Sequence, residues 1–229
     1  MLASLGASWY GAFAVNEVPK KPRPYADAPR LPGPVGESTP VDVRSLVAGS
    51  AVEIEIGPGR GGFMFERAAA APTTGLVGFE VRRKWATIVD GRLSKAGLGA
   101  RARVFAEDAK AALPRLVPDA SVARVFMHFP DPWWKKRHQK RLVMGDVLLD
   151  HVARLLAPGG ELFVQTDVEE RADQYEAMIA AHGRFEAFGD TPASARLAEN
   201  PYGARSPREH RAIADGIPIH RLRYRVRAV

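Results

Sequence analysis

Positions 51–62 of the chain read Ala51-Val52-Glu53-Ile54-Glu55-Ile56-Gly57-Pro58-Gly59-Arg60-Gly61-Gly62. The first half, residues 51–56, is apolar apart from its two acids, which predicts a short buried strand. The second half is a glycine-rich loop, and residues 63–71 after it predict a helix. A strand, a glycine loop and a helix in this order indicate an α/β fold that binds its ligand at the carboxyl end of the strand.

The alternation of strands and helices continues along the chain. Further strands are predicted at residues 74–79, 101–106, 122–127, 161–166 and near 219–226, and further helices at 81–96, 109–113, 143–156 and 168–181. Residues 158–160, Pro-Gly-Gly, are expected to end the third of these helices, whose buried side is expected to carry Val147, Leu148, Val152 and Leu155. This order predicts a doubly wound, mostly parallel, Rossmann-like sheet in a single α/β domain, residues 41–229.

Residues 1–40 form a segment of a different kind. Two stretches of it, 19–24 and 29–40, are rich in proline, which interrupts helices and sheet ladders. We interpret this segment as a basic, extended N-terminal arm, which is either disordered or ordered against RNA or against the domain.

The composition limits the classes of function. The net charge is +7 and the pI is about 9.9, so a polyanionic partner fits the charge. The chain has no cysteine, which excludes disulfides, thiolate metal sites and a cysteine nucleophile, and which is compatible with a reducing compartment such as the cytoplasm. No run approaches the roughly 18 apolar residues of a membrane span. A membrane span is therefore not predicted. The six histidines show no i, i+4 pairing, so a metal site is not predicted either.

The glycine loop fits two cofactor patterns. Gly57, Gly59 and Gly62 match the dinucleotide pattern G-x-G-x-x-G. Gly57, Gly59 and Gly61 match equally well the looser E-x-G-x-G-x-G of S-adenosyl-L-methionine-dependent methyltransferases. The loop alone therefore leaves NAD and S-adenosyl-L-methionine as alternatives.

The acids that end the predicted strands favour one of the two cofactors. They are Glu55, Glu80, Asp108 and Asp131. Glu80 stands where a carboxylate accepts hydrogen bonds from ribose hydroxyls in both classes, but Glu55 would lie near a bound pyrophosphate, where like charges repel. S-adenosyl-L-methionine has no phosphate and carries a cationic sulfonium and amino group. The set of acids favours this cofactor, unless Glu55 and Asp108 are ordinary caps or turn acids.

Residues 128–141 read His-Phe-Pro-Asp-Pro-Trp-Trp-Lys-Lys-Arg-His-Gln-Lys-Arg. Asp131 stands between two prolines at the end of a predicted strand, where α/β sheets place their ligands. The cations after it are expected to bind the substrate or its phosphates, namely Lys135, Lys136, Arg137, Lys140 and Arg141. Trp133 either stacks on an exposed base or packs in the core.

Five motifs together resemble one family. They are residues 54–61, Gly78-Phe79-Glu80-Val81, residues 129–138, Gln165-Thr166-Asp167, and Ser206-Pro207-Arg208-Glu209 followed by Gly216. The chain, over roughly residues 52–224, resembles the tRNA (guanine-N7)-methyltransferases of the bacterial type. The resemblance implies a class I methyltransferase fold with an antiparallel C-terminal strand. It also implies methyl transfer from S-adenosyl-L-methionine to guanine N7 in tRNA, usually at position 46 of the variable loop.

The resemblance also implies roles for individual residues. The cofactor site would contain Glu55, Gly57, Gly59, Glu80, Asp108 and Asp131, and the substrate site Lys135, Asp167, Ser206, Pro207, Arg208 and Glu209. Two positions depart from the usual pattern, since Ser206 stands where the family often has threonine, and Arg208 where it often has an aromatic residue. Ser206 keeps the hydroxyl, so the hydrogen bond expected of this position is retained.

The chemistry of the reaction shapes what is expected of Asp131. Guanine N7 carries an in-plane lone pair, so it attacks the methyl group without first losing a proton. Asp131 is therefore expected to orient the guanine or to stabilise the charge that forms on it, and not to act as a strong base. The alternatives to an RNA methyltransferase are an NAD-dependent oxidoreductase and a non-catalytic RNA-binding module. The oligomeric state, monomer or homodimer, stays open.

Overall fold

The computed structural model describes residues 24–33, 39–130 and 143–227. The predictions for Asp131, Trp133 and the cations of 135–141 therefore concern residues outside the described part, as does most of the N-terminal arm. None of the described helices is long and apolar enough to cross a membrane.

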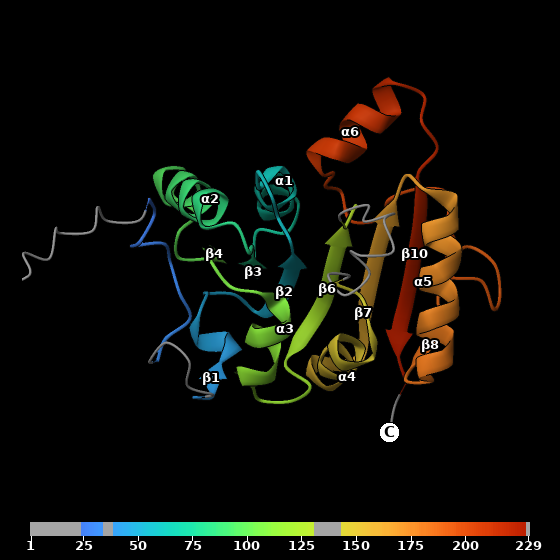
Figure 1. Cartoon of the computed structure of the whole chain (residues 1–229), viewed down its shortest axis with the longest axis horizontal. Helices are drawn as coiled ribbons and strands as arrows, with labels where there is room; N and C mark the ends of the chain where they lie inside the picture. Colours follow the sequence, from blue (N-terminus) through green and yellow to red (C-terminus); the bar gives the residue numbers. More distant parts are fainter. Residues whose placement is uncertain (1–23, 34–38, 131–142, 228–229) are drawn as a thin grey trace, which may run out of the picture.

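An eight-stranded sheet forms the centre of the described part (Figure 1). Its strand order is β4 (Ala102–Phe105), β3 (Thr74–Phe79), β2 (Ala51–Ile56), β6 (Val122–His128), β7 (Leu156–Thr166), β10 (His220–Val226) and β8 (Phe185–Ala187), with β9 (Arg196–Leu197) paired to β10. The first five strands of this order run parallel, and β10 runs antiparallel to β7 and β8. The predicted doubly wound sheet with an antiparallel C-terminal strand is confirmed.

Helices cover both faces of this sheet (Figure 1). One face packs against α3 (Ala109–Ala112), α4 (Asp146–Leu155) and α5 (Glu169–His182), and the other against α1 (Gly62–Ala70) and α2 (Arg83–Lys95). Because both faces are covered, the central strands are mostly buried, and every residue of β3 is buried. A small second sheet pairs β1 (Val41–Asp42) with β5 (Leu116–Val117), beside the single turns η1 (Val43–Ser45) and η2 (Leu113–Arg115).

The region around α4 differs from its prediction. The helix begins at Asp146, and Val147, which was expected on its buried side, is 65% exposed. The inward stripe, at the spacing of a helix, consists of Leu148, Leu149, Val152, Ala153 and Leu155. Residues 158–160, expected to end the helix, instead lie inside β7, which starts at Leu156. The prediction for Val147 was wrong because one position along a helix corresponds to a rotation of about 100°, which turns Val147 away from the stripe that begins at Leu148.

Three elements lie between residues 182 and 218, for which the sequence predicted neither helix nor strand, namely β8, β9 and α6 (Pro207–Ala214). In α6, only Glu209 and Ala212 are buried, so the helix has almost no apolar stripe. A signal for its start is present, however. Ser206 caps the helix by accepting a hydrogen bond from Glu209 N–H (3.2 Å), Pro207 follows it, and Glu209 stands at the third position of the first turn.

The described part of the N-terminal arm, residues 24–33, lies against the domain beside β4. Ala28 and Leu31 are buried, and the backbone N–H of Ala106 donates to the carbonyl of Pro29 (2.7 Å). Arg30 forms an ion pair with Glu107 (3.1 Å). This short piece of the arm is therefore held by packing as well as by polar contacts.

Candidate active site

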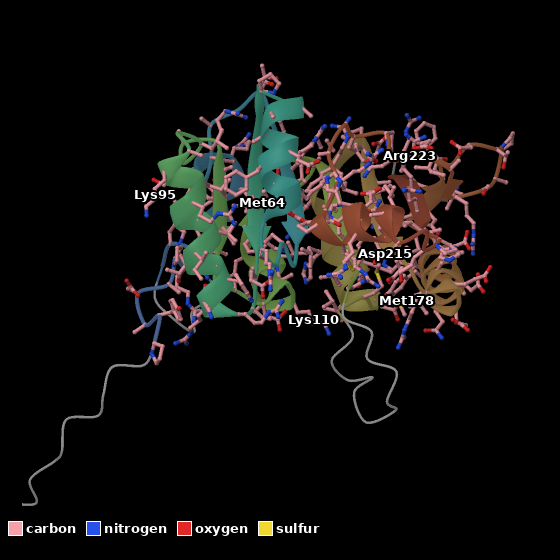
Figure 2. The ribbon with its side chains drawn as sticks, turned by 90° about the horizontal axis from the view of Figure 1, so that it is seen from above. Met64, Lys95, Lys110, Met178, Asp215 and Arg223 are labelled. Carbon is pink, nitrogen blue, oxygen red and sulfur yellow. The ribbon has the colours of Figure 1, made fainter. Side chains whose placement is uncertain are left out.

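A cavity of about 520 Å³ opens at the carboxyl ends of β2, β3, β6 and β7. Figure 1 shows α6 standing beyond the ends of β6 and β7, and Figure 2 looks down on this edge, with α6 beside α1. Of the residues predicted for the site, nine line this cavity: Glu55, Gly57, Gly59, Glu80, Asp108, Asp167, Ser206, Pro207 and Arg208. The fold thus brings together residues that are more than 150 positions apart in the sequence.

The glycine loop between β2 and α1 forms the first wall. Gly57, Gly59 and Gly61 have φ angles of +74°, +54° and +77°, which other residues rarely adopt. At Gly61 there is also no room, because an added Cβ would lie 2.3 Å from Val89 Cγ1 of α2. The glycines therefore let the loop turn sharply over the end of β2 while α1 and α2 stay in contact.

Glu80 is held in a fixed orientation at the end of β3. Its side chain is almost fully buried, and its Oε2 accepts a hydrogen bond from Gly59 N–H (3.0 Å). Its Oε1 accepts from Arg82 N–H (2.9 Å) and faces the Arg82 guanidinium (3.3 Å). Each carboxylate oxygen has two lone pairs, so these three contacts leave one lone pair for a hydroxyl donor, on Oε2. A second hydroxyl donor would take the place of the exposed Arg82 guanidinium on Oε1.

Asp108 and Glu55 have different surroundings. Asp108 is exposed and caps α3 by accepting a hydrogen bond from Lys110 N–H (3.0 Å). Asp108 is therefore a helix cap, which was the alternative to a cofactor ligand, and it also lines the cavity. Glu55 caps no helix. It lies buried within β2, and its Oε1 is 2.9 Å from Nδ1 of His128, a residue for which the sequence predicted no role. Both carboxylates line the cavity.

The second wall comes from the end of β7 and the start of α6. Asp167 Oδ2 accepts a hydrogen bond from Arg208 Nε (2.9 Å) and is also contacted by Arg208 Nη2. Arg208, the residue that departs from the usual pattern, is therefore paired with Asp167, the acid predicted to bind the substrate. Ser206 and Pro207 lie beside it.

Glu209 lies behind this wall and does not line the cavity. Its side chain is fully buried, with Oε1 at 3.0 Å from Arg221 Nη2 and Oε2 accepting from Asn200 Nδ2 (2.9 Å). These contacts tie α6 to β10. A direct contact between Glu209 and the substrate stays a prediction.

The C-terminal end of strand β6 leads into the segment that carries Asp131. Phe129 has a φ of +46°, which is uncommon for a bulky side chain, and its N–H donates to the carbonyl of Gln165 (2.8 Å). Phe129 and Pro130 both line the cavity. The backbone thus turns at the cavity just before Asp131, which is itself outside the described residues.

The matching family model and the curated relatives indicate one class of enzyme. Residues 50–222 match a protein-family model described as "Putative methyltransferase". The chain is 36% identical over 199 residues to the tRNA (guanine-N(7)-)-methyltransferase of Myxococcus xanthus, with 84% of this chain and 95% of the relative covered. It is 40% identical over 177 residues to the protein of the same name from Anaeromyxobacter dehalogenans, with 77% and 86% covered.

Solved structures share the fold. The crystal structure of the 16S rRNA methyltransferase KamB matches with a TM-score of 0.57 and 17% identity, over 81% of this chain and 91% of its own. A protein of Agrobacterium tumefaciens described as a predicted O-methyltransferase matches with a TM-score of 0.50 and 17% identity, over 83% and 78%. At such identities the likeness concerns the fold alone.

Proposed function

Because the chain belongs to the tRNA (guanine-N7)-methyltransferase family, we propose that it transfers a methyl group from S-adenosyl-L-methionine to N7 of guanine 46 in the variable loop of tRNA. It has the class I methyltransferase fold. A tRNA substrate would place its work in the cytoplasm. The family and the acid-lined cavity together disfavour an NAD-dependent oxidoreductase.

The observation that carries the cofactor assignment is the set of carboxylates in one cavity. Glu55, Glu80 and Asp108 line it from three neighbouring strand ends. Glu55 Oε2, which has no partner among the described residues, and the lone pair left on Glu80 Oε2 fit a ligand with cationic and hydroxyl groups and fit a pyrophosphate poorly. When bound, S-adenosyl-L-methionine supplies a methyl group activated by its sulfonium. Glu80 would hold the ribose hydroxyls and Glu55 the cationic amino group.

The second wall of the cavity suits a guanine. Asp167 can accept hydrogen bonds from the guanine N1–H and exocyclic amine, and the Ser206 hydroxyl can complete the site. As N7 attacks, a C–N bond forms and the C–S bond breaks, so positive charge moves onto the guanine ring. A carboxylate near the ring stabilises that charge, and Asp131, which lies outside the described residues, is proposed to serve this purpose together with Asp167. Arg208 shares Asp167 Oδ2 and so limits which oxygen can meet the base.

Cations beside the cavity suit the tRNA backbone. Arg205, Arg208 and Arg211 are exposed at the start of α6 and within it. Together with the cations of 135–141, which lie outside the described residues, they would neutralise phosphates. Such contacts contribute affinity and fix orientation, and they carry little sequence information.

The function is tested by incubating the protein with unmodified tRNA and methyl-labelled S-adenosyl-L-methionine, followed by nucleoside analysis. The expected product is labelled 7-methylguanosine, and a tRNA with adenine in place of guanine 46 should take up no label. Binding of tRNA without methyl transfer would instead favour the non-catalytic RNA-binding alternative. Label in the adenine-46 tRNA would overturn the assignment of position 46.

A substitution at Gly62 tests whether α6 places the substrate. An added Cβ would lie 2.4 Å from Pro207 Cγ, an atom of a rigid ring, so Gly62→Ala should push the start of α6 away from α1. A displacement of the α6 residues by about 1 Å should lower kcat by about 10- to 100-fold. Cofactor affinity should change little, because its proposed acidic ligands lie at the ends of β2, β3 and β4 and not on α6. Gly91→Ala in α2, where a Cβ meets nothing within 4 Å, is the matched control and should keep full activity.

A further inference from the structure

Three buried polar side chains meet at the edge of the cavity from three neighbouring strands. They are Glu55 of β2, His128 of β6 and Gln165 of β7, with 5%, 8% and 0% of their surfaces exposed. His128 and Gln165 are direct partners in the β6–β7 register, and Glu55 is paired with Phe126, two residues before His128. Glu55 and His128 both line the cavity.

The hydrogen bonding of this group is incomplete. His128 Nδ1 lies 2.9 Å from Glu55 Oε1. Among the described residues, Glu55 Oε2, His128 Nε2 and both amide atoms of Gln165 have no hydrogen-bond partner, although all four are buried. Buried polar atoms are nearly always paired, so this concentration at a cavity points to a ligand or an ordered water.

The preceding acid on the same face of β2, Glu53, has different hydrogen-bond partners. Glu53 is contacted by Arg67 and Arg124, both at 2.7 Å, so its charge is matched within the protein. Glu55 instead contacts an imidazole through one oxygen and keeps the other unpaired among the described residues. A carboxylate in this state is ready to take a cationic group from a ligand.

Aromatic packing fixes the imidazole. The ring of His128 lies 4.2 Å from that of Phe63 and 6.0 Å from that of Phe163, measured between centroids. A side chain locked on several sides can hold a neighbour in one orientation, because it has no other rotamer available at low cost.

We propose that His128 is a positioning residue: its Nδ1–H donates to Glu55 Oε1 and holds Oε2 for the ammonium group of the methyl donor. This inference rests on the proposed function, since it concerns how the same cofactor is bound. Without this donor the carboxylate would be free to rotate, and Oε2 would meet a cation less often in the right orientation.

The test compares two ligands on three variants by calorimetry. S-Adenosylhomocysteine carries the ammonium group, and 5′-methylthioadenosine keeps the adenine, ribose and sulfur but lacks the amino-acid part. His128→Phe and His128→Leu remove the donor in two shapes, so that one folded variant is enough. His128→Asn keeps an N–H donor at the same distance from the backbone as Nδ1. Thermal unfolding confirms that each variant is folded.

In the Phe or Leu variant, the Kd for S-adenosylhomocysteine should rise about tenfold or more, as expected for a weakened charge-assisted contact. The Kd for 5′-methylthioadenosine should stay within about twofold, and His128→Asn should restore most of the lost affinity. Unchanged binding of S-adenosylhomocysteine would overturn the proposal, and so would an equal loss for both ligands, which indicates a merely structural role. If the wild-type protein binds neither ligand, the proposed function itself fails.

Discussion

Replacing Glu80 with alanine should weaken the binding of S-adenosyl-L-methionine by about 100-fold or more, because two hydrogen bonds from hydroxyls to a charged acceptor contribute about 1.5–3 kcal/mol each. The geometry makes the loss large. Gly59 N–H and Arg82 N–H already orient the carboxylate, so no side-chain entropy is lost when the cofactor binds. Isothermal titration calorimetry with S-adenosyl-L-methionine measures the change directly.

Two matched variants separate this effect from a general change in charge. Glu80→Gln keeps one carbonyl acceptor and should lie between the wild type and alanine. Glu107→Ala removes an acid that pairs with Arg30 and does not line the cavity, so it should bind the cofactor normally. Equal affinities of Glu80→Ala and Glu107→Ala would remove the assignment of Glu80 to the ribose.

The positions of Glu80 and Asp108 could be predicted because they depend on local pattern. Each follows a mainly apolar run of four to six residues that forms a parallel strand, and parallel strands end at the same edge of a sheet. The pairing of the strands themselves need not be known in detail. For this reason the central sheet and the acids at its carboxyl edge could be expected from the sequence.

The contacts between distant residues could not be predicted in this way. His128 and Glu55 are 73 positions apart, and Glu209 and Arg221 meet only because α6 folds back toward β10. A lone histidine after an apolar strand carries no local signal for its partner. The α6 helix was overlooked because its buried side consists of Glu209 and Ala212, which gives no apolar periodicity.

Buried charge also holds the α1 side of the sheet together. Glu53 of β2 is fully buried and accepts hydrogen bonds from Arg67 of α1 and Arg124 of β6. Arg67 also donates to the carbonyl of Tyr202 (2.7 Å), and the Tyr202 hydroxyl donates to Glu161 of β7 (3.0 Å). Burial is the main cause that raises the pKa of Tyr202 well above its usual value, and the nearby negative charge of Glu161 raises it further. The hydroxyl therefore keeps its proton and remains a hydrogen-bond donor.

Glu53→Ala should therefore lower the stability of the protein by about 3–5 kcal/mol, because it leaves Arg67 buried and Arg124 half-buried without their shared anion. For a domain of this size the melting temperature should fall by about 10 °C, as measured by circular dichroism. Arg211→Ala provides the control, since it breaks an ion pair with Asp215 whose side chains are 74% and 49% exposed. Such surface pairs contribute little, so its melting temperature should change by less than about 2 °C. Similar melting temperatures for the two variants would show that the Glu53 network does not hold α1 to the sheet.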